Sequence, residues 1–117
     1  MSDRVLVTGA GGFIGHHLVT YLRNRGCRVR GVDLNHPEFG ASDADEFRLL
    51  DLRRQADCLA ATRDVDQVYA LGADMGGMGF ISANHAQILH NNVLINTQTL
   101  EAAHRNGVRP YLFASSA

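Results

Sequence analysis

Glycines at every third position are the most suggestive feature of this sequence. Gly9, Gly12 and Gly15 lie in the stretch VTGAGGFIG, between an apolar run at 4–7 and a helical pattern that begins at Phe13. Gly9 would allow a tight turn, Gly12 would let the backbone approach a phosphate, and Gly15 would let the helix pack closely on a sheet. The N-terminus of a helix also offers unpaired N–H groups to an anion. This arrangement is typical of a site for a phosphate-bearing ligand.

An acidic residue ends the next apolar run. Asp33 follows the segment 29–32 and lies near the ~20-residue distance at which dinucleotide-binding sequences place an acid for the ribose hydroxyls. Its carboxylate would repel a 2′-phosphate, and no arginine follows it in DLNHP. The residues therefore favour NAD over NADP. Two other interpretations stay open: the glycines form only a structural turn, and Asp33 only caps the segment after the strand.

The elements that must position these residues alternate between strand and helix patterns. The expected strands are 4–7, 29–32, 47–50, 68–71 and 111–114, and the expected helices are 13–25, 53–61 and 85–105. Ile14, Leu18 and Leu22 form the apolar stripe of the first helix, and Gly26 ends it. This alternation predicts an α/β fold with a doubly wound, parallel sheet of five strands in the order 3-2-1-4-5.

Composition indicates one globular domain. The chain has 117 residues, of which 45% are hydrophobic and 20% are charged. A net charge of -1 gives no electrostatic support for nucleic-acid or membrane binding. Without a membrane-spanning run or a signal-peptide pattern, a cytoplasmic location is expected. Cys27 and Cys58 are expected as free thiols on packed faces, and no metal site is expected from the scattered histidines.

Several segments resemble the extended short-chain dehydrogenase/reductase family, which includes NAD-dependent epimerases and dehydratases. They are the glycine turn at 9–15, DLR at 51–53, VYALGAD at 68–74, NNVLINTQTLEAAHRNGV at 91–108 and PYLFASSA at 110–117. The resemblance covers the whole chain. Gly72 is a mild departure, because the family usually has alanine there. The resemblance implies a Rossmann-like fold.

The same resemblance implies NAD as the cofactor and assigns residues to it. Asp51 would bond the adenine amino group, Leu52 would line the adenine pocket, and Asn92 would kink the long helix and relay protons. The segment that contains Leu71 would pass the adenosine ribose and the pyrophosphate. The whole expected cofactor set is Gly9, Gly12, Phe13, Ile14, Gly15, Asp33, Asp51, Leu52, Leu71 and Ala73.

The segment ADMGGMGF at 73–80 resembles one subfamily, the GDP-mannose 3,5-epimerases. By that resemblance Gly76 contacts the sugar nucleotide, Ser116 is a catalytic residue that bonds the C4 oxygen of the sugar, and Ala117 lies beside it at the substrate. The residues alone leave another interpretation open, in which the methionines of this loop are core residues and its glycines form an irregular turn.

The implied reaction oxidises C4 of the sugar transiently with NAD, epimerises C3 and C5, and then returns the hydride. The family transfers protons with a Tyr-x-x-x-Lys pair and a cysteine, which would follow Ala117. Tyr21, Tyr69 and Tyr111 each lack a lysine four residues on, and the sequence has no lysine. The chain is therefore expected to be inactive alone.

We expect residues 1–117 to be the incomplete NAD-binding domain of a nucleotide-sugar epimerase, truncated before its substrate domain. The partner would be a nucleotide sugar, with GDP-mannose favoured. The homodimer of the family is doubtful for this fragment, because only the helix 85–105 of its interface is present. Two alternatives stay open: another nucleotide-sugar 4-epimerase or dehydratase, and a non-catalytic NAD-binding module.

Overall fold

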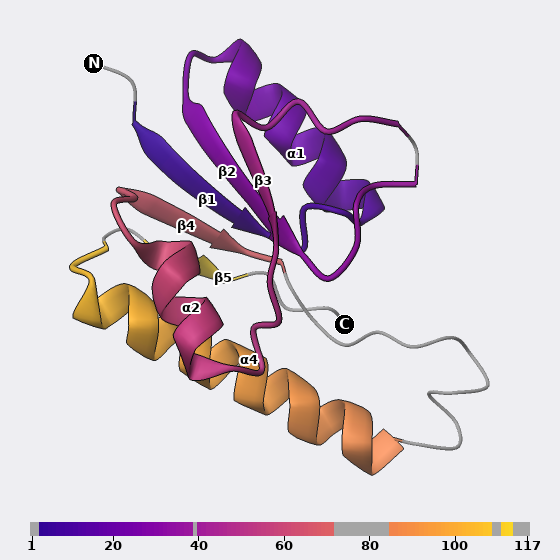
Figure 1. Cartoon of the computed structure of the whole chain (residues 1–117), viewed down its shortest axis with the longest axis vertical. Coiled ribbons are helices and arrows are strands. Elements are labelled where there is room, and N and C mark those ends of the chain that lie inside the picture. Colours follow the sequence, from indigo (N-terminus) through magenta and orange to yellow (C-terminus); the bar gives the residue numbers. More distant parts are fainter. Residues whose placement is uncertain (1–2, 39, 72–84, 109–110, 114–117) are drawn as a thin grey trace.

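The computed structural model describes residues 3–38, 40–71, 85–108 and 111–113. A parallel sheet with the strand order β3-β2-β1-β4-β5 forms its centre (Figure 1). The elements in chain order are β1 (Arg4–Thr8), α1 (Phe13–Asn24), β2 (Arg28–Asp33), β3 (Glu46–Leu49), α2 (Gln55–Thr62), β4 (Gln67–Ala70), α4 (His85–Arg105) and β5 (Tyr111–Phe113). Within these ranges, no helix is both long and apolar enough to cross a membrane.

Every strand pairing is parallel, so the carboxyl ends of the strands meet at one edge of the sheet. Thr8 at the end of β1 pairs with Val32 on one side and with Ala70 on the other, and Asp33 at the end of β2 pairs with Leu49. The predicted parallel, doubly wound class is confirmed, with β3, β2, β1 and β4 in the predicted order. The short strand β5 pairs with β4.

Helices cover both faces of the sheet (Figure 1): α1 lies on one face, and α2 and α4 lie on the other. Successive side chains of β1 therefore enter two separate cores. The core under α1 contains Val5, Val7, Ala10, Val19, Leu22 and Val29. The core under α2 and α4 contains Leu6, Val32, Leu52, Cys58, Ala61, Val65, Val68, Ala70, Ala102, Ala103 and Val108. Burial on both sides explains the continuous apolar run of β1.

The end of α1 and two residues of its apolar stripe follow the prediction, since Leu22 is buried and Leu18 packs against the core. Gly26 has a φ of 89°, and its N–H donates to the carbonyl of Arg23 at 3.0 Å, which closes the helix as expected. Ile14 was predicted to belong to the apolar stripe and is 71% exposed. Gly15 and Val19 join Leu22 on the buried face in place of Ile14.

The start of the second helix is a correction. The helix begins at Gln55, not at Arg53, because Asp51 forms a turn with the residues after it. Its carboxylate accepts the main-chain N–H of Arg53 at 3.0 Å, and its carbonyl accepts that of Arg54 at 2.9 Å. Both cysteines are free, Cys58 in a core and Cys27 packed against the other, as predicted.

Candidate dinucleotide-binding site

The chain leaves β1 through a tight turn at the carboxyl edge of the sheet. Gly9 has a φ of 70°, a left-handed conformation that a side chain would disfavour. The N–H of Gly12 then donates to the carbonyl of Gly9 at 3.1 Å, and the N–H of Ala10 donates to Val32 of the neighbouring strand at 3.2 Å. The tight turn predicted at Gly9 is confirmed.

Gly12 and Gly15 have different surroundings. A Cβ atom at Gly15 would lie 2.2 Å from the carbonyl oxygen of Gly9, so only glycine lets α1 pack this close to the turn. A Cβ atom at Gly12 would find its nearest heavy atom at 3.5 Å. Gly12 is the N-cap of α1, and no described side chain caps that end of the helix. The first-turn amides of α1 thus have room for an external anion.

Asp33 is tied to the glycine turn by a bond that sequence reasoning missed. Its Oδ2 accepts the N–H of Gly11 at 2.9 Å, and its Oδ1 accepts the N–H of Leu34 at 2.6 Å. A Cβ atom at Gly11 would lie 2.4 Å from the carbonyl oxygen of Asn35 and 2.9 Å from this Oδ2. Gly11 is therefore required by the acid, and the extra glycine in GAGG was the available signal.

The two bonds leave a defined acceptor pattern on Asp33. An ionised carboxylate has about four lone-pair positions, two on each oxygen. Within the described part of the chain, one is filled on Oδ1 and one on Oδ2. Each oxygen therefore keeps one acceptor position. Two adjacent hydroxyl groups, as in a ribose, are donors of matching number and spacing.

A second acid follows the neighbouring strand. Asp51 comes two residues after Leu49, the β3 partner of Asp33. Its Oδ1 accepts Arg53 Nε at 2.9 Å and its Oδ2 accepts Arg53 Nη2 at 2.8 Å. The hydrogen bond from Arg53 lowers the pKa of Asp51, against the opposing effect of its partial burial. Asp51 is therefore an ionised carboxylate at neutral pH.

The other predicted cofactor and substrate residues differ in how far their side chains are exposed, and some lie outside the described residues. Phe13 and Ile14, at the start of α1, are both exposed, Phe13 by 62% and Ile14 by 71%. Leu52 is only 7% exposed and packs in the core under α2 and α4, which leaves little of its side chain for a ligand. Leu71 is partly buried against the core under α1. Ala73, Gly76, Ser116 and Ala117 lie outside the described residues, as does the side chain of Asn92.

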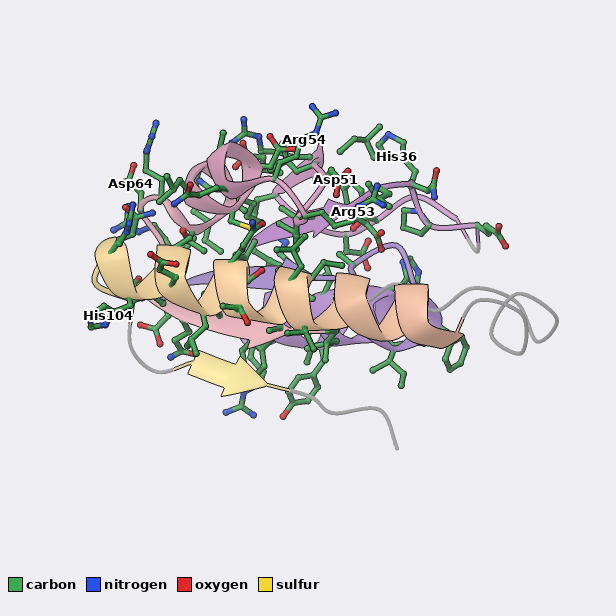
Figure 2. The ribbon with its side chains drawn as sticks, turned by 90° about the horizontal axis from the view of Figure 1, so that it is seen from below. His36, Asp51, Arg53, Arg54, Asp64 and His104 are labelled. Carbon is green, nitrogen blue, oxygen red and sulfur yellow. The ribbon has the colours of Figure 1, made fainter. Side chains whose placement is uncertain are left out.

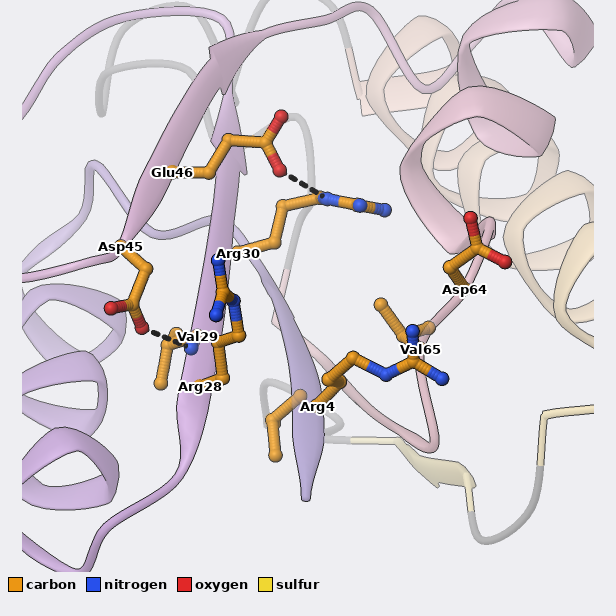
Figure 3. Close-up of a pocket in the computed structure, with 9 residues that line it drawn as sticks. Arg4, Arg28, Val29, Arg30, Asp45, Glu46, Asp64 and Val65 are labelled. Carbon is orange, nitrogen blue, oxygen red and sulfur yellow. Dashed lines mark hydrogen bonds and ion pairs between the residues drawn. The ribbon is translucent and has the colours of Figure 1, made fainter. Parts of the chain in front are cut away.

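A charged hollow of about 200 Å³ lies at the opposite, amino-terminal edge of the sheet (Figure 3). Its lining includes Arg4, Arg28, Arg30, Asp45, Glu46 and Asp64. Arg30 Nε bonds Glu46 Oε1 at 2.8 Å, and Asp45 Oδ2 accepts the N–H of Val29 at 2.7 Å. Because its charges balance and the glycine turn is at the other edge, this hollow is separate from the candidate site.

A family comparison agrees with the geometry of the carboxyl edge. Residues 5–117 match the model of the NAD dependent epimerase/dehydratase family. The chain belongs to this family. GDP-mannose 3,5-epimerase 1 of Oryza sativa subsp. indica is 47% identical over 116 residues, which are 97% of this chain and 31% of that protein. The chain thus spans about a third of the length of this curated relative.

Solved structures of the family share the fold. A short-chain dehydrogenase/reductase superfamily protein from Agrobacterium tumefaciens with bound NAD is 34% identical, with a TM-score of 0.80. The match covers 97% of this chain and 32% of that one. A UDP-galactose 4-epimerase is 30% identical with a TM-score of 0.83, over 97% of this chain and 38% of that one.

Proposed function

We propose that residues 1–117 form the NAD-binding, five-stranded Rossmann-type domain of a nucleotide-sugar epimerase. One observation carries the proposal: the carboxylate of Asp33 is fixed to the glycine turn through Gly11 and keeps one acceptor position on each oxygen. This arrangement suits a ribose diol beside a pyrophosphate at the N-terminus of α1. The N-terminus of α1, which no side chain of the described residues caps, and the close packing at Gly15 support it.

The same carboxylate distinguishes the two nicotinamide dinucleotides. The free acceptor positions of Asp33 match hydroxyl donors, whereas a 2′-phosphate brings only acceptors and negative charge. Leu34, Asn35 and His36 follow Asp33, so the adjoining chain supplies no arginine to pair with that phosphate. We therefore assign NAD rather than NADP.

The substrate is proposed from the similarity to GDP-mannose 3,5-epimerase. NAD, when bound, supplies a reversible hydride acceptor for C4 of the sugar. The residues described here bind and orient that cofactor. The carboxylates of Asp33 and Asp51 accept hydrogen bonds from its hydroxyl and amino groups, and the turn at Gly12 leaves room for its phosphates. Gly76 and Ser116 are the proposed substrate contacts. The tyrosine–lysine pair of the family has no counterpart in these 117 residues, so we expect no epimerisation by this chain alone.

Calorimetric titration of the purified 117-residue chain tests the proposal. We expect saturable binding of NAD and at least tenfold weaker binding of NADP, since one unsatisfied charged contact costs about 1.4 kcal/mol or more. GDP-mannose, titrated with and without NAD, tests the substrate assignment. A folded chain that binds neither dinucleotide would refute the assignment of an NAD site.

A further inference from the structure

Side chains from two helices hold the main chain of the segment 51–54, between β3 and α2. The N–H of Asp51 donates to Asp57 Oδ2 of α2 at 2.8 Å. Gln98 on α4 has its side-chain amide oriented so that both its nitrogen and its oxygen find partners. Its amide nitrogen then donates to the carbonyls of Arg53 at 2.7 Å and Leu52 at 3.2 Å. These side chains of α2 and α4 therefore fix the backbone of this segment.

The Arg53 guanidinium bonds the Asp51 carboxylate. Figure 2 shows the two side chains together above α4. Asp51 Oδ1 accepts two donors, the main-chain N–H of Arg53 at 3.0 Å and its Nε at 2.9 Å, and Oδ2 accepts Nη2 at 2.8 Å. Of about four lone-pair positions on a carboxylate, the described residues fill three. One position remains, on Oδ2, and the side chain is 22% exposed, so a ligand can reach it.

This single acceptor lies where the base of a dinucleotide would be. Ligands of doubly wound sheets bind outside the carboxyl ends of the strands. Asp33, which suits the ribose, ends β2 and pairs with Leu49 of β3, and Asp51 comes two residues after Leu49 at the same edge. An ionised carboxylate with one open position accepts an exocyclic amino group of a purine and repels a keto oxygen.

We propose that Arg53 is a positioning residue that makes the site selective for a 6-aminopurine, by fixing the Asp51 carboxylate with one open acceptor. The proposal rests on the NAD-binding function proposed above. Arg53 also holds the pKa of Asp51 below its ordinary value. The carboxyl group therefore carries no proton that it could donate to a keto oxygen.

The test compares NAD with nicotinamide hypoxanthine dinucleotide, in which an oxygen replaces the 6-amino group. Calorimetry should show that the unmodified chain prefers NAD by about tenfold, the value of one charged hydrogen bond. Arg53→Ala should weaken NAD about five- to tenfold and leave the hypoxanthine analogue unchanged, so the preference disappears. Arg53→Lys keeps the charge but loses the paired donors, and should retain only part of the preference.

Arg54→Ala is the matched control. It removes the same charge from the neighbouring position, and the Arg54 side chain acts on the Asp51 carboxylate by charge rather than by a hydrogen bond. This variant should keep the preference for NAD. Equal weakening of both dinucleotides by Arg53→Ala, or an unchanged preference, would overturn the positioning role. NAD binding without any preference would overturn the inference but leave the NAD site intact. Binding of neither dinucleotide would refute the proposed function itself.

Discussion

The carbonyl oxygen of Gly9 lies 2.2 Å from the place where a side chain at Gly15 would begin. Gly15→Ala must therefore push α1 away from the turn, because the obstacle is backbone. We expect a loss of about 1–3 kcal/mol in the free energy of unfolding, as for other overpacked sites. Urea denaturation followed by circular dichroism measures it. A variant as stable as the parent chain would contradict the close packing.

Gly12→Ala separates binding from folding. A Cβ atom there would lie 3.5 Å from the nearest heavy atom, an ordinary contact, and the φ of -80° suits alanine. The urea midpoint should stay close to that of the parent chain. The affinity for NAD should fall by about tenfold or more, because the methyl group occupies the proposed approach of the pyrophosphate. Unchanged affinity would place the phosphates elsewhere.

Asp33→Asn tests the choice between dinucleotides. The amide keeps an acceptor but loses the charge and one oxygen, so NAD should bind about ten- to a hundredfold more weakly. Binding of NADP should change less, since the repulsion of its phosphate is relieved. Calorimetric titration with both ligands gives the ratio. Glu101→Gln is the control, because it removes an equal charge from an exposed acid of α4 that pairs with Arg105. It should leave the ratio of the NAD and NADP affinities unaltered.

Arg30 joins three elements through one guanidinium. Its Nη1 donates to the carbonyls of Ala61 at 2.9 Å and Arg63 at 2.7 Å at the end of α2, and its Nε bonds Glu46 of β3. Arg30→Met should lower the free energy of unfolding by about 1–3 kcal/mol, because those carbonyls lose a charged donor. Arg48→Met removes a more exposed arginine that lies 3.8 Å from Glu46. Chemical denaturation should show a change within about 0.5 kcal/mol for this second variant.

Cys58 should make the stability depend on pH in the alkaline range. Burial raises the pKa of this thiol above its ordinary value, although the hydrogen bond with Thr99 acts in the opposite direction. The folded state therefore favours the neutral thiol. This contribution to stability is complete below the pKa of the unfolded thiol and is lost as the pH rises toward that of the folded one. Urea denaturation from pH 7 to 10 should show a steeper loss for the parent chain than for Cys58→Ala.

Parallel slopes for those two proteins would contradict the pKa shift. The cavity that Cys58→Ala leaves lowers the free energy of unfolding by the same amount at every pH. A difference in pH slope between the two proteins therefore reports the thiol and not the cavity. Alkylation under native conditions gives an independent measurement. The partly exposed Cys27 should react well before the buried Cys58.

The sequence predicted the sheet and the acid of the site because both follow from short-range patterns. The apolar run of β1 and the glycines after it determine where the strand ends and the helix starts. Asp33 was found because its place at the end of the next strand brings it to the same edge as the turn. The exposure of Ile14 was not predicted, since helical spacing alone does not say which face meets the sheet.

The contacts that orient the site could not be predicted in this way. Gly11 matters because the carbonyl of Asn35 and the carboxylate of Asp33 lie against it, and both come from the end of β2 and the residues just after it. The resemblance pointed to Asp51 but gave Arg53 no role. That role depends on the turn after β3, which also delays the start of α2 until Gln55. Such contacts depend on the directions of side chains and main-chain groups, and these are fixed only when the segments pack against one another.

The bond between Gly11 and Asp33 also bears on the speed of binding. It joins two protein groups and does not depend on a ligand, so the groups that bind the ribose and the phosphates are held together before the dinucleotide arrives. Little ordering of the turn is then left to occur during association. Substitutions of Asp33 that remove this bond should consequently slow the association of the dinucleotide as well as shorten the time that it stays bound.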